Sequence, residues 1–432
     1  MGKTLVIAEK PSVATDIAKV LKAPRDKSKD FFENDEYVVS SAVGHLLELA
    51  VPEKHDIKRG KWSFDKLPHL PPQFTLKPIA KSESRLKVLK RLMKRKDVDT
   101  LVNACDAGRE GELIFRYIIQ HTKAKQPSKR LWLQSMTPTA IREGFTQLRE
   151  NDSMLPLAAA ATCRSEADWL VGINGTRAMT AFNSKGGGFF LTTVGRVQTP
   201  TLAVVVEREQ AIKDFISRDY WEAHATFQAE AGEYTGRWFD EGFKRDEDDA
   251  HKRAERIWDQ AKADTIKSAC EGQPGVVTEE SKPSKQAPPL LFDLTTLQRD
   301  ANSRFGFSAK NTLAIAQALY ERHKVCTYPR TDSKALPEDY PSTVRKTLEQ
   351  LAAGHYGQLA DKVLKEGWVV PGNKRIFNNA KISDHFAIIP TLQAPKNLKE
   401  QEQKVYDLIV KRFLAVFYPS AEFEVTTRIT RV

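Results

Sequence analysis

A tyrosine and an arginine stand two residues apart in the segment TYPRTDS, residues 327–333. Tyr328 precedes a proline, which biases it toward an extended backbone, and Arg330 then falls on the same side of the chain. A phenol with a pKa of about 10 is a poor nucleophile at neutral pH, but a neighbouring guanidinium favours the phenolate and binds phosphate. Although most tyrosines serve only in packing, this pair suits phosphotyrosine chemistry on a nucleic-acid backbone.

Carboxylates follow two predicted strands near the N-terminus. Glu9 and Lys10 come directly after one apolar run, and Asp106 and Glu110 follow a second one. Ligands collect at the carboxyl ends of strands in an open parallel sheet, so we expect Glu9, Asp106 and Glu110 to converge there. Such carboxylates repel one another unless a cation lies between them, and an all-oxygen site suits Mg²⁺. The alternative is that Asp106 and Glu110 only complement a helix dipole.

Polar groups suited to phosphate and base contacts gather in the segment GRVQTP, residues 195–200. Arg196 and Gln198 lie there at the predicted start of a helix. Arg164 and Asp168 stand four apart on an earlier predicted helix, where they could equally form a surface ion pair.

A histidine stands in the segment SDHFAIIP, residues 383–390. His385 could donate a hydrogen bond to a phosphate or relay a proton. A buried histidine with only a structural role is the alternative.

The elements that must position these groups alternate between strand and helix over the first 150 residues. Apolar runs predict strands at 3–8, 37–42 and 100–104, and helical periodicity covers 11–21, 82–96 and a stretch ending at 119. This alternation predicts an α/β domain with a largely parallel sheet, in which Glu9 and Asp106 follow strand ends.

The rest of the chain is mixed. Residues 155–210 are predicted to be helical apart from a glycine-rich loop at 185–188, and strands are predicted at 220–228 and 233–239. A segment rich in Pro, Ser, Lys and Gln at 271–290 is interpreted as a linker. Helices follow at 294–320 and 398–417, and a strand at 423–432.

The composition of the chain limits the kinds of partner that it can have. The chain has 432 residues, and 67 Lys and Arg against 56 Asp and Glu give a formal net charge of +11. The surplus favours an anionic partner such as nucleic acid, unless the surface is basic without being used. There is no apolar run of about 18 residues for a membrane span, and no GxxxxGK[ST] motif for an ATP-driven motor. The four cysteines form no C-x-x-C pair, which indicates a reduced, cytoplasmic compartment.

Taken together and in this order, the motifs resemble type IA DNA topoisomerases, and within them the topoisomerase III branch. The segments AEKPS at 8–12 and DAGREGE at 106–112 resemble the two ends of that family's Toprim metal site. GRVQTP resembles its single-strand-binding helix start, TYPRTD its nucleophile segment, and His385 with the following AIIP its DNA-binding histidine.

The resemblance implies a Toprim Rossmann-like sheet domain, helical domains and a β-rich arch that form a toroidal, here incomplete, clamp. The implied ranges are 1–152 for Toprim, 153–217 for a helical single-strand-binding domain, 218–288 for the arch, 289–396 for the helical domain with the nucleophile, and 397–432 for the return into the arch. Relatives commonly exceed about 600 residues, so the chain is expected to be an N-terminal portion of a longer protein.

The resemblance also implies roles. Tyr328 would attack phosphorus and hold the 5′ end, while Arg330 and Lys10 stabilise the phosphate and Glu9 protonates the leaving 3′ oxygen. Mg²⁺ would be held by Glu9, Asp106 and Glu110. Single-stranded DNA would be gripped by Arg164, Asp168, Arg196, Gln198 and His385.

The metal motif departs from the family pattern. Many members have Asp-x-Asp-x-Glu, whereas this chain has Gly108 between Asp106 and Glu110. One carboxylate is therefore missing, and Glu112 is a poor substitute because two residues along a helix turn it about 200° away.

Two other functions stay open: a non-catalytic fragment that only binds single-stranded DNA, and a Toprim nuclease or primase. The expected partner is single-stranded or underwound DNA in the cytoplasm, associated with the nucleoid, with no membrane and no ATP; a helicase or another DNA-processing protein is a further expected partner. Cys105 adjoins Asp106 and Cys326 lies two residues before Tyr328, so we hypothesise that alkylating an accessible one would inhibit cleavage.

Overall fold

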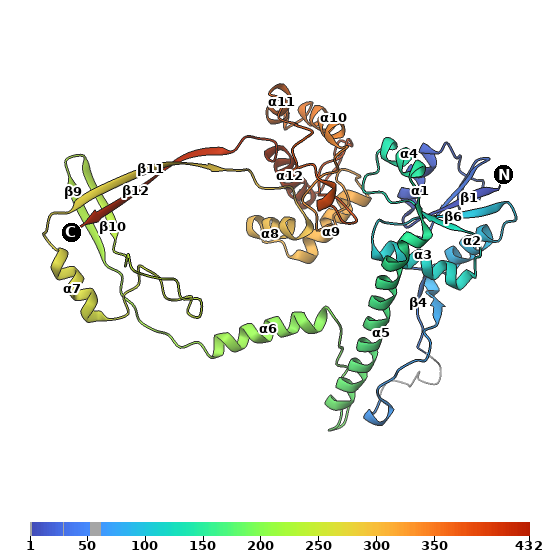
Figure 1. The fold of residues 1–432 in the computed structure, drawn as a ribbon, viewed down its shortest axis with the longest axis horizontal. Coiled ribbons are helices and arrows are strands. Elements are labelled where there is room, and N and C mark those ends of the chain that lie inside the picture. Colours follow the sequence, from blue (N-terminus) through green and yellow to red (C-terminus); the bar gives the residue numbers. More distant parts are fainter. Residues whose placement is uncertain (1, 29, 52–61) are drawn as a thin grey trace. The chain divides into compact units, whose positions relative to one another are not determined.

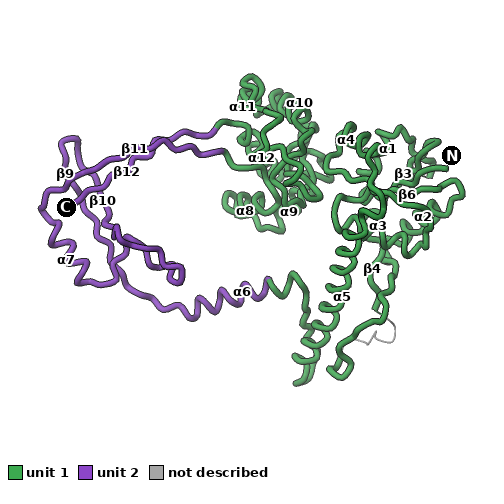
Figure 2. The backbone as a smooth tube through the Cα atoms, in the orientation of Figure 1, with its two compact units in different colours: residues 1–200, 288–419 green, residues 201–287, 420–432 purple. Residues whose placement is uncertain are grey.

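The structure is a computed structural model that describes residues 2–28, 30–51 and 62–432. Its chain divides into two compact units, coloured green and purple in Figure 2. Unit 1 comprises residues 1–200 and 288–419, and unit 2 comprises residues 201–287 and 420–432.

A mostly parallel sheet forms the N-terminal part of unit 1 (Figure 1). Its strands, in the order β2-β3-β1-β6-β7-β8, are β2 (Phe32–Glu33), β3 (Tyr37–Ser41), β1 (Lys3–Ala8), β6 (Val98–Ala104), β7 (Ser128–Arg130) and β8 (Arg149–Glu150). The four inner strands pair in parallel, and β2 and β8 pair antiparallel at the edges. Leu5, Val6 and Ile7 are all fully buried, which is typical of a parallel strand covered on both faces. The predicted α/β class is confirmed.

Helices cover both faces of this sheet. The helices α1 (Pro11–Val20) and α4 (Pro138–Thr146) share a core with Val6, whereas α2 (Glu83–Met93) and α3 (Arg109–Thr122) share a second core with Leu5 and Ile7. The two cores separate in this way because successive residues of a strand point to opposite faces. A two-stranded antiparallel pair, β4 (Leu47–Leu49) with β5 (Leu76–Pro78), packs against the second core.

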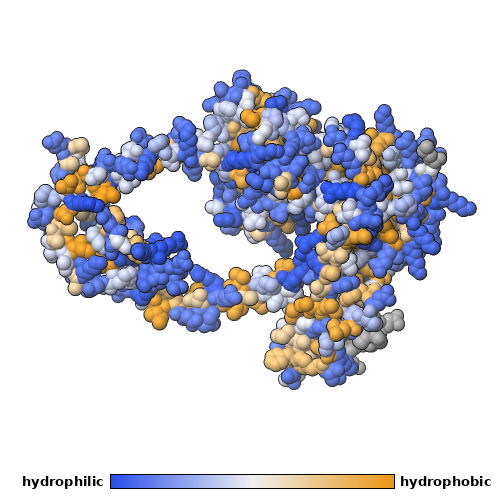
Figure 3. All heavy atoms as spheres, viewed as in Figure 1, coloured by the Kyte–Doolittle hydropathy of each residue, from blue (hydrophilic) through white to orange (hydrophobic). Residues whose placement is uncertain are grey.

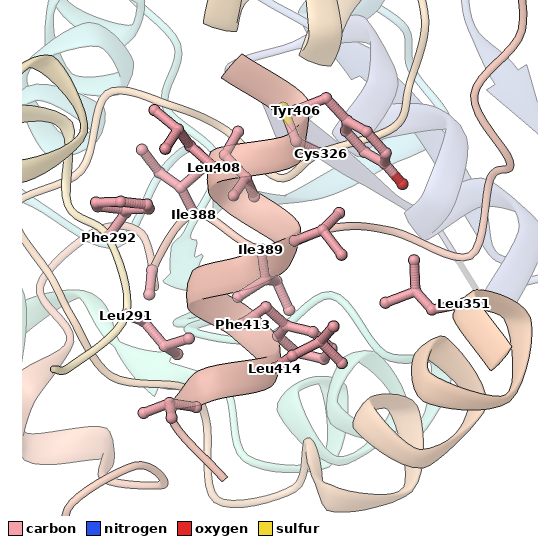
Figure 4. Packing of buried hydrophobic residues seen from close by; sticks show 14 of the residues in the cluster. Leu291, Phe292, Cys326, Leu351, Ile388, Ile389, Tyr406, Leu408, Phe413 and Leu414 are labelled. Atoms are coloured by element: carbon pink, nitrogen blue, oxygen red, sulfur yellow. The ribbon is translucent and has the colours of Figure 1, made fainter. Parts of the chain in front are cut away.

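Five further helices form the second part of unit 1 around one core. They are α8 (Leu294–Phe305), α9 (Ala309–Glu321), α10 (Pro341–Ala352), α11 (Gly357–Lys365) and α12 (Glu400–Ala415). Side chains of α12 such as Leu408 and Phe413 lie in the middle of this cluster, beside Cys326, Ile388 and Ile389 (Figure 4). This core therefore holds the two loops that carry Tyr328 and His385.

The long helix α5 (Leu155–Asn183) belongs to unit 1 and contacts α3, where the Tyr117 hydroxyl donates to Ser165 Oγ at 3.0 Å. The helix α6 (Gln198–Lys213) follows it after the predicted glycine-rich loop. Hydrophobic side chains interrupt the polar surface along α6 (Figure 3). The exposed ones include Leu202, Val204, Val205 and Val206. Among the described helices, none is both long enough and apolar enough to cross a bilayer.

Unit 2 is built from two ribbons, the helix α7 and most of the helix α6. It contains the hairpin β9 (His224–Ala229) and β10 (Gly232–Arg237), the helix α7 (Gln260–Cys270), and the pair β11 (Val276–Gln286) and β12 (Ala421–Arg431). The interpretation of residues 271–290 as a linker is wrong, because residues 276–286 pair antiparallel with β12 along their whole length. The error has a physical cause: every residue of β11 is exposed, so neither face needs the apolar alternation that reveals a strand.

A candidate active site at the ends of two parallel strands

Glu9 and Asp106 follow adjacent parallel strands. Ala8, the last residue of β1, pairs with Ala104, the last residue of β6. The chain therefore leaves the sheet at the same edge after both strands, as the sequence predicts.

A buried ionic network fixes the backbone after β6. Arg130, only 1% exposed, donates to the carbonyl oxygens of Cys105 at 2.7 Å and Asp106 at 2.6 Å. Glu112, equally buried, lies 3.5 Å from Arg130 Nε and accepts a hydrogen bond from Asn103 at 3.0 Å. Glu112 thus supports the sheet, in agreement with the expectation that it is no substitute for a metal ligand. The sequence analysis missed Arg130, because one arginine in a short polar strand gives no signal of burial.

Two loops of the helical part run side by side and bring Tyr328 and His385 together. The Thr327 amide donates to the Ile389 carbonyl at 3.0 Å, and the Thr331 hydroxyl donates to the His385 carbonyl at 2.8 Å. The rings of Tyr328 and His385 then meet edge to face, with centroids 4.5 Å apart. The backbone pairing of the loops, rather than either residue alone, sets this contact.

Lys10 joins the strand ends to these loops. Its Nζ lies 2.5 Å from Asp106 Oδ2, 3.4 Å from His385 Nε2 and 4.2 Å from the centroid of the Tyr328 ring. His385 Nε2 lies 3.2 Å from the same Asp106 oxygen. Four of the predicted site residues therefore touch one another, and Glu9 interacts electrostatically with Lys10, Asp106 and His385. A cavity of about 520 Å³ adjoins them.

The pocket shifts its carboxyl groups in opposite directions. Burial raises the pKa of Glu9, and repulsion from Asp106 adds to this effect against the attraction of Lys10 and His385. Burial also acts to raise the pKa of Asp106, but the hydrogen bond from His385 and the charge of Lys10 hold it below its usual value. Burial acts to lower the pKa of Lys10, and the attraction of Asp106 keeps it above normal. The pocket thus makes Glu9 a weaker acid than an ordinary glutamate and Asp106 a stronger acid than an ordinary aspartate.

The pKa of the Tyr328 phenol is not lowered, contrary to the expectation drawn from the neighbouring Arg330. Lys10 and Arg330 both act to lower its pKa, but burial outweighs them and the pKa is raised. Arg330 is exposed, and in the amide orientation that satisfies both groups the Gln317 oxygen accepts from Arg330 Nε at 3.2 Å. The pairing of Tyr328 and Arg330 is therefore electrostatic, and Gln317, which the sequence analysis missed, orients the guanidinium.

Glu110 does not share the contacts of the other acids. It lies in the first turn of α3, is exposed, and its Oε2 lies 3.2 Å from His45 Nε2. Within residues 2–28, 30–51 and 62–432, no three acidic, histidine or cysteine side chains are gathered closely enough to hold a metal ion. The expected convergence of Glu9, Asp106 and Glu110 is therefore not found, because the helix start turns Glu110 toward His45.

Oxygen ligands for a divalent cation are nonetheless present. Mg²⁺ typically takes one or two carboxylates and several waters. Glu9 Oε2 is buried and accepts no hydrogen bond from any described residue. Asp106 beside it carries its charge at neutral pH, so this donor set fits a hard divalent cation.

The four predicted DNA-binding residues outside the pocket lie on α5 and at the start of α6. The Arg196 guanidinium pairs with Asp168, so the alternative pair of Arg164 with Asp168 is not formed. Arg164 Nε is buried and has no hydrogen-bond partner among the described residues, and Gln198 is exposed. We call residues 192–198 the α5-flanking segment, because its amides at 192 and 194 donate to threonine hydroxyls of α5.

The two cysteines near the pocket are buried. Burial raises the pKa of the Cys105 thiol well above its usual value and that of Cys326 to about 12. Neither meets the condition of accessibility on which the alkylation hypothesis depends. Cys163, on α5, is the exposed one among the four.

Comparison with known proteins agrees with this geometry. Residues 152–432 match the family model described as DNA topoisomerase, and residues 4–136 match the model of the Toprim domain. The chain is 43% identical to DNA topoisomerase 3 of Bacillus cereus over 437 residues, and 42% identical to DNA topoisomerase 3 of Bacillus subtilis over 436 residues. In both cases all of this chain is covered but only 57% of the relative.

A solved structure shares the fold. It is the full-length topoisomerase I of Thermotoga maritima, which matches with a TM-score of 0.60 at 24% identity and covers 99% of this chain and 63% of that one. The chain thus spans somewhat more than half the length of the curated relatives it matches.

Proposed function

Since this chain belongs to the type IA DNA topoisomerase family, in its topoisomerase III branch, we propose that it cleaves one strand of DNA without ATP through Tyr328. A second strand would pass through the break before it is resealed. The proposal concerns the protein of which this chain spans a part, and cleavage and binding of single-stranded DNA are the steps assigned to the residues present.

Tyr328 is the proposed nucleophile. Its phenolic oxygen attacks the phosphorus, a bond forms between them, and the bond from phosphorus to the 3′ oxygen breaks. The phenol loses one proton and the 3′ oxygen gains one, so cleavage needs no net acid or base. Because the phosphodiester energy is kept in the phosphotyrosine, religation is the same step reversed and requires no nucleotide.

We assign to Lys10 and Arg330 the stabilisation of the negative charge on the phosphate. Lys10 Nζ lies 4.2 Å from the centre of the Tyr328 ring, so it can reach the oxygens of a phosphorus bonded to that phenol. Burial raises the pKa of the Tyr328 phenol, so the neutral phenol is the form from which we propose the attack begins. Positive charge placed where negative charge develops then lowers the barrier.

Glu9 is the proposed acid for the leaving 3′ oxygen. Its pKa is raised by burial and by Asp106, so it keeps a proton more readily than an exposed glutamate. Toprim domains bind divalent metal, and we assign Mg²⁺ to the carboxyl groups of Glu9 and Asp106. When bound, Mg²⁺ would supply positive charge beside the phosphate.

Single-stranded DNA is the proposed substrate. Binding of this DNA combines charged groups for the phosphate backbone with amide and imidazole groups for the bases. The residues that we assign to it are Arg164, Asp168, Arg196, Gln198 and His385. This substrate places the protein on DNA in the cytoplasm, and a helicase or another enzyme that exposes single strands would be a fitting partner.

The observation that carries the proposal is the contact of Tyr328 with both Lys10 and His385, beside Asp106. The test is to incubate the chain with Mg²⁺ and a single-stranded oligonucleotide labelled at its 3′ end, and then to denature the mixture. The label is expected to migrate with the protein. The same oligonucleotide labelled at its 5′ end should give only a free, shortened fragment.

Two variants make this test specific. Tyr328→Phe removes the nucleophilic oxygen and is expected to abolish the adduct. Tyr406→Phe removes a hydroxyl that is buried in the core without a hydrogen-bond partner among the described residues, and is expected to keep it. Reversible binding without an adduct in the unaltered chain would favour a fragment that only binds single-stranded DNA. An adduct that survives Tyr328→Phe would refute the assignment.

A further inference from the structure

The C-terminal end of α5 exposes aromatic side chains with a lysine among them. Phe182, in the last turn of the helix, is 56% exposed, and Phe190, in the loop that follows, is 60% exposed. Hydrophobic side chains gather at this end of the helix (Figure 3). Soluble proteins rarely leave a contiguous apolar patch exposed unless it binds something. We call this group the aromatic platform, and it consists of Trp62, Phe64, Phe182, Lys185, Phe189 and Phe190.

The platform is assembled from two segments that are far apart in the chain. The Nζ of Lys185 lies 5.0 Å from the centroid of the Phe182 ring and 5.2 Å from that of the Phe64 ring. The rings of Trp62 and Phe189 meet edge to face, with centroids 5.9 Å apart. These contacts hold the rings of residues 62–64 against those of residues 182–189, so the platform is formed before any ligand binds.

Hydrogen bonds fix the loop of the platform to the end of α5. The Phe190 amide donates to Ser184 Oγ at 3.1 Å, and the side-chain amide of Asn183 donates to Thr192 Oγ1 at 2.7 Å. Thr192 is the first residue of the α5-flanking segment. The platform therefore continues directly into the segment that carries Arg196.

The α5-flanking segment connects the platform to a group already assigned to DNA. It contacts Thr180 through its residue Thr192, and it contacts Asp168 through Arg196. Twelve residues of α5 separate these two contacts, which corresponds to about 18 Å along the helix. A DNA strand that is bound at Arg196 and continues along α5 in this direction would reach the platform.

The charge of this region selects an anionic ligand. Residues 169–206 contain no acidic residue and three basic ones, which are Arg177, Lys185 and Arg196. The guanidinium carbon of Arg177 lies 5.6 Å from the centroid of the Trp62 ring, so cations adjoin the rings at two places. Lysine is depleted in protein–protein interfaces, whereas aromatic rings combined with basic groups are typical of sites for single-stranded nucleic acid.

We propose that the aromatic platform is a second binding site for single-stranded DNA, separate from the pocket of Tyr328. Bases stack on the rings of Phe182 and Phe190, and Lys185 faces the phosphates. The site rests on the proposed function for its substrate and adds a contact that motif and pocket do not contain. Because every base has an aromatic face, binding at the platform does not depend on sequence.

The experiment separates stacking from attraction by charge. The whole chain is titrated by fluorescence anisotropy, without Mg²⁺, into a thymidine oligonucleotide of about 16 residues and into an oligonucleotide of the same length without bases. Phe182→Ala and Phe190→Ala are each expected to weaken binding of the thymidine strand by at least about fivefold, and binding of the baseless strand by less than about twofold. Phe182→Trp keeps an aromatic face and should keep the affinity. Phe182→Leu keeps an apolar side chain without that face and should lose as much affinity as Phe182→Ala.

Two further variants serve as references for this series. Lys185→Gln is expected to weaken binding of both oligonucleotides alike and to reduce the slope of log affinity against log salt by about 0.7. Phe423→Ala is the matched control, because Phe423 on β12 of unit 2 is 50% exposed and lies outside the platform. Its affinity for either strand should stay within about twofold of that of the unaltered chain.

Cross-linking locates the bound bases directly. An oligonucleotide that carries 5-iodouracil is irradiated with the chain, and the tryptic peptides 178–185 and 186–196 are expected to carry the cross-link. Unchanged binding of the thymidine strand in Phe182→Ala and Phe190→Ala would overturn this proposal and leave the proposed cleavage intact. An affinity kept in Phe182→Leu would show apolar contact instead of stacking and would also overturn it. An unaltered chain that binds no single-stranded DNA would overturn both the platform and the proposed function.

Discussion

The pocket around Tyr328 and the α5-flanking segment each contain an ion pair, and the two pairs lie in different surroundings. In the pocket, the side chains of Lys10 and Asp106 are 22% and 16% exposed. Beside α5, the side chains of Arg196 and Asp168 are 49% and 36% exposed. Charges interact strongly where water is largely excluded, and exposed charges are screened by salt. Pairing in the pocket therefore shifts the pKa values of its groups, whereas the exposed pair beside α5 is the more strongly screened of the two.

The two regions also differ in what holds them in place: the pocket rests on a packed core, and the α5-flanking segment rests on hydrogen bonds. The loop that carries Tyr328 is anchored by Cys326 and Ile389 in the helical core, and Lys10 follows the buried strand β1. The α5-flanking segment rests on hydrogen bonds from its backbone amides to Thr176 and Thr180. A catalytic group needs a position fixed by packing, while a group that grips a flexible strand can adapt. The difference suggests that the pocket governs chemistry and the segment governs affinity.

The substitution with the largest expected effect is Lys10→Met, which should slow the chemical step of cleavage. The change removes the charge next to Tyr328 and keeps an apolar stem of similar length. We expect the rate of adduct formation to fall by about 10²- to 10³-fold, as when a group that stabilises developing charge is lost. The affinity for a single-stranded oligonucleotide should change by less than about threefold. The two quantities are measured by rapid-quench cleavage and by fluorescence anisotropy.

Lys19→Met is the control for this variant. Lys19 is an exposed residue in the last turn of α1, so its substitution removes the same charge without touching the pocket. Its cleavage rate should equal that of the unaltered chain. If Lys10→Met instead loses affinity and keeps its rate, the division between the two regions fails.

Much of the pocket could be predicted because local patterns determine it. A buried parallel strand has to be a continuous apolar run, so β1 and β6 were visible in the sequence and placed Glu9 and Asp106 at one edge. Tyr328 was visible through the neighbouring proline and arginine. These residues are positioned by the elements in which they lie.

What could not be predicted depends on contacts between distant segments. Gly108 is recognisable as a missing carboxylate, but nothing in its own segment shows that Asp384 comes to lie against it. Likewise, Glu110 is turned toward His45, a residue distant in the chain, and the periodicity of α3 does not reveal this contact.

The strand β11 was missed for a related reason. Its stabilising partner is β12, far along the chain, and both of its faces are exposed, so it has no periodic apolar residues. Propensity then favoured a linker, since Pro, Ser and Lys are all poor strand formers. Backbone pairing with a distant segment overrode that preference.

A smaller effect is expected beside α5, in Arg196→Ala. The exposed guanidinium is assigned to a phosphate, so its loss should weaken binding of a single-stranded oligonucleotide by about tenfold at low salt. It should also reduce the slope of log affinity against log salt by about 0.7. The rate of cleavage at saturating DNA should stay within about twofold. Arg142→Ala, which removes an exposed arginine from α4, is the control for the change in net charge. Equal losses in the two variants would show that only total charge matters.

The smallest effect on activity is expected from alkylation, which compares the exposure of the two regions directly. Cys163 is exposed on α5, next to Arg164, whereas Cys105 and Cys326 are buried, and burial raises the pKa of both thiols. Because the thiolate is the reactive form, iodoacetamide should modify Cys163 at least about a hundredfold faster than the two buried cysteines, as followed by mass spectrometry of peptides. The rate of cleavage at saturating DNA should change by less than about twofold after Cys163 has reacted. In the Cys163→Ser variant, the same treatment with iodoacetamide should not change the rate. Rapid modification of Cys105 or Cys326 with loss of cleavage would mean that the pocket opens in solution, and the contrast between a closed pocket and an open segment would then not hold.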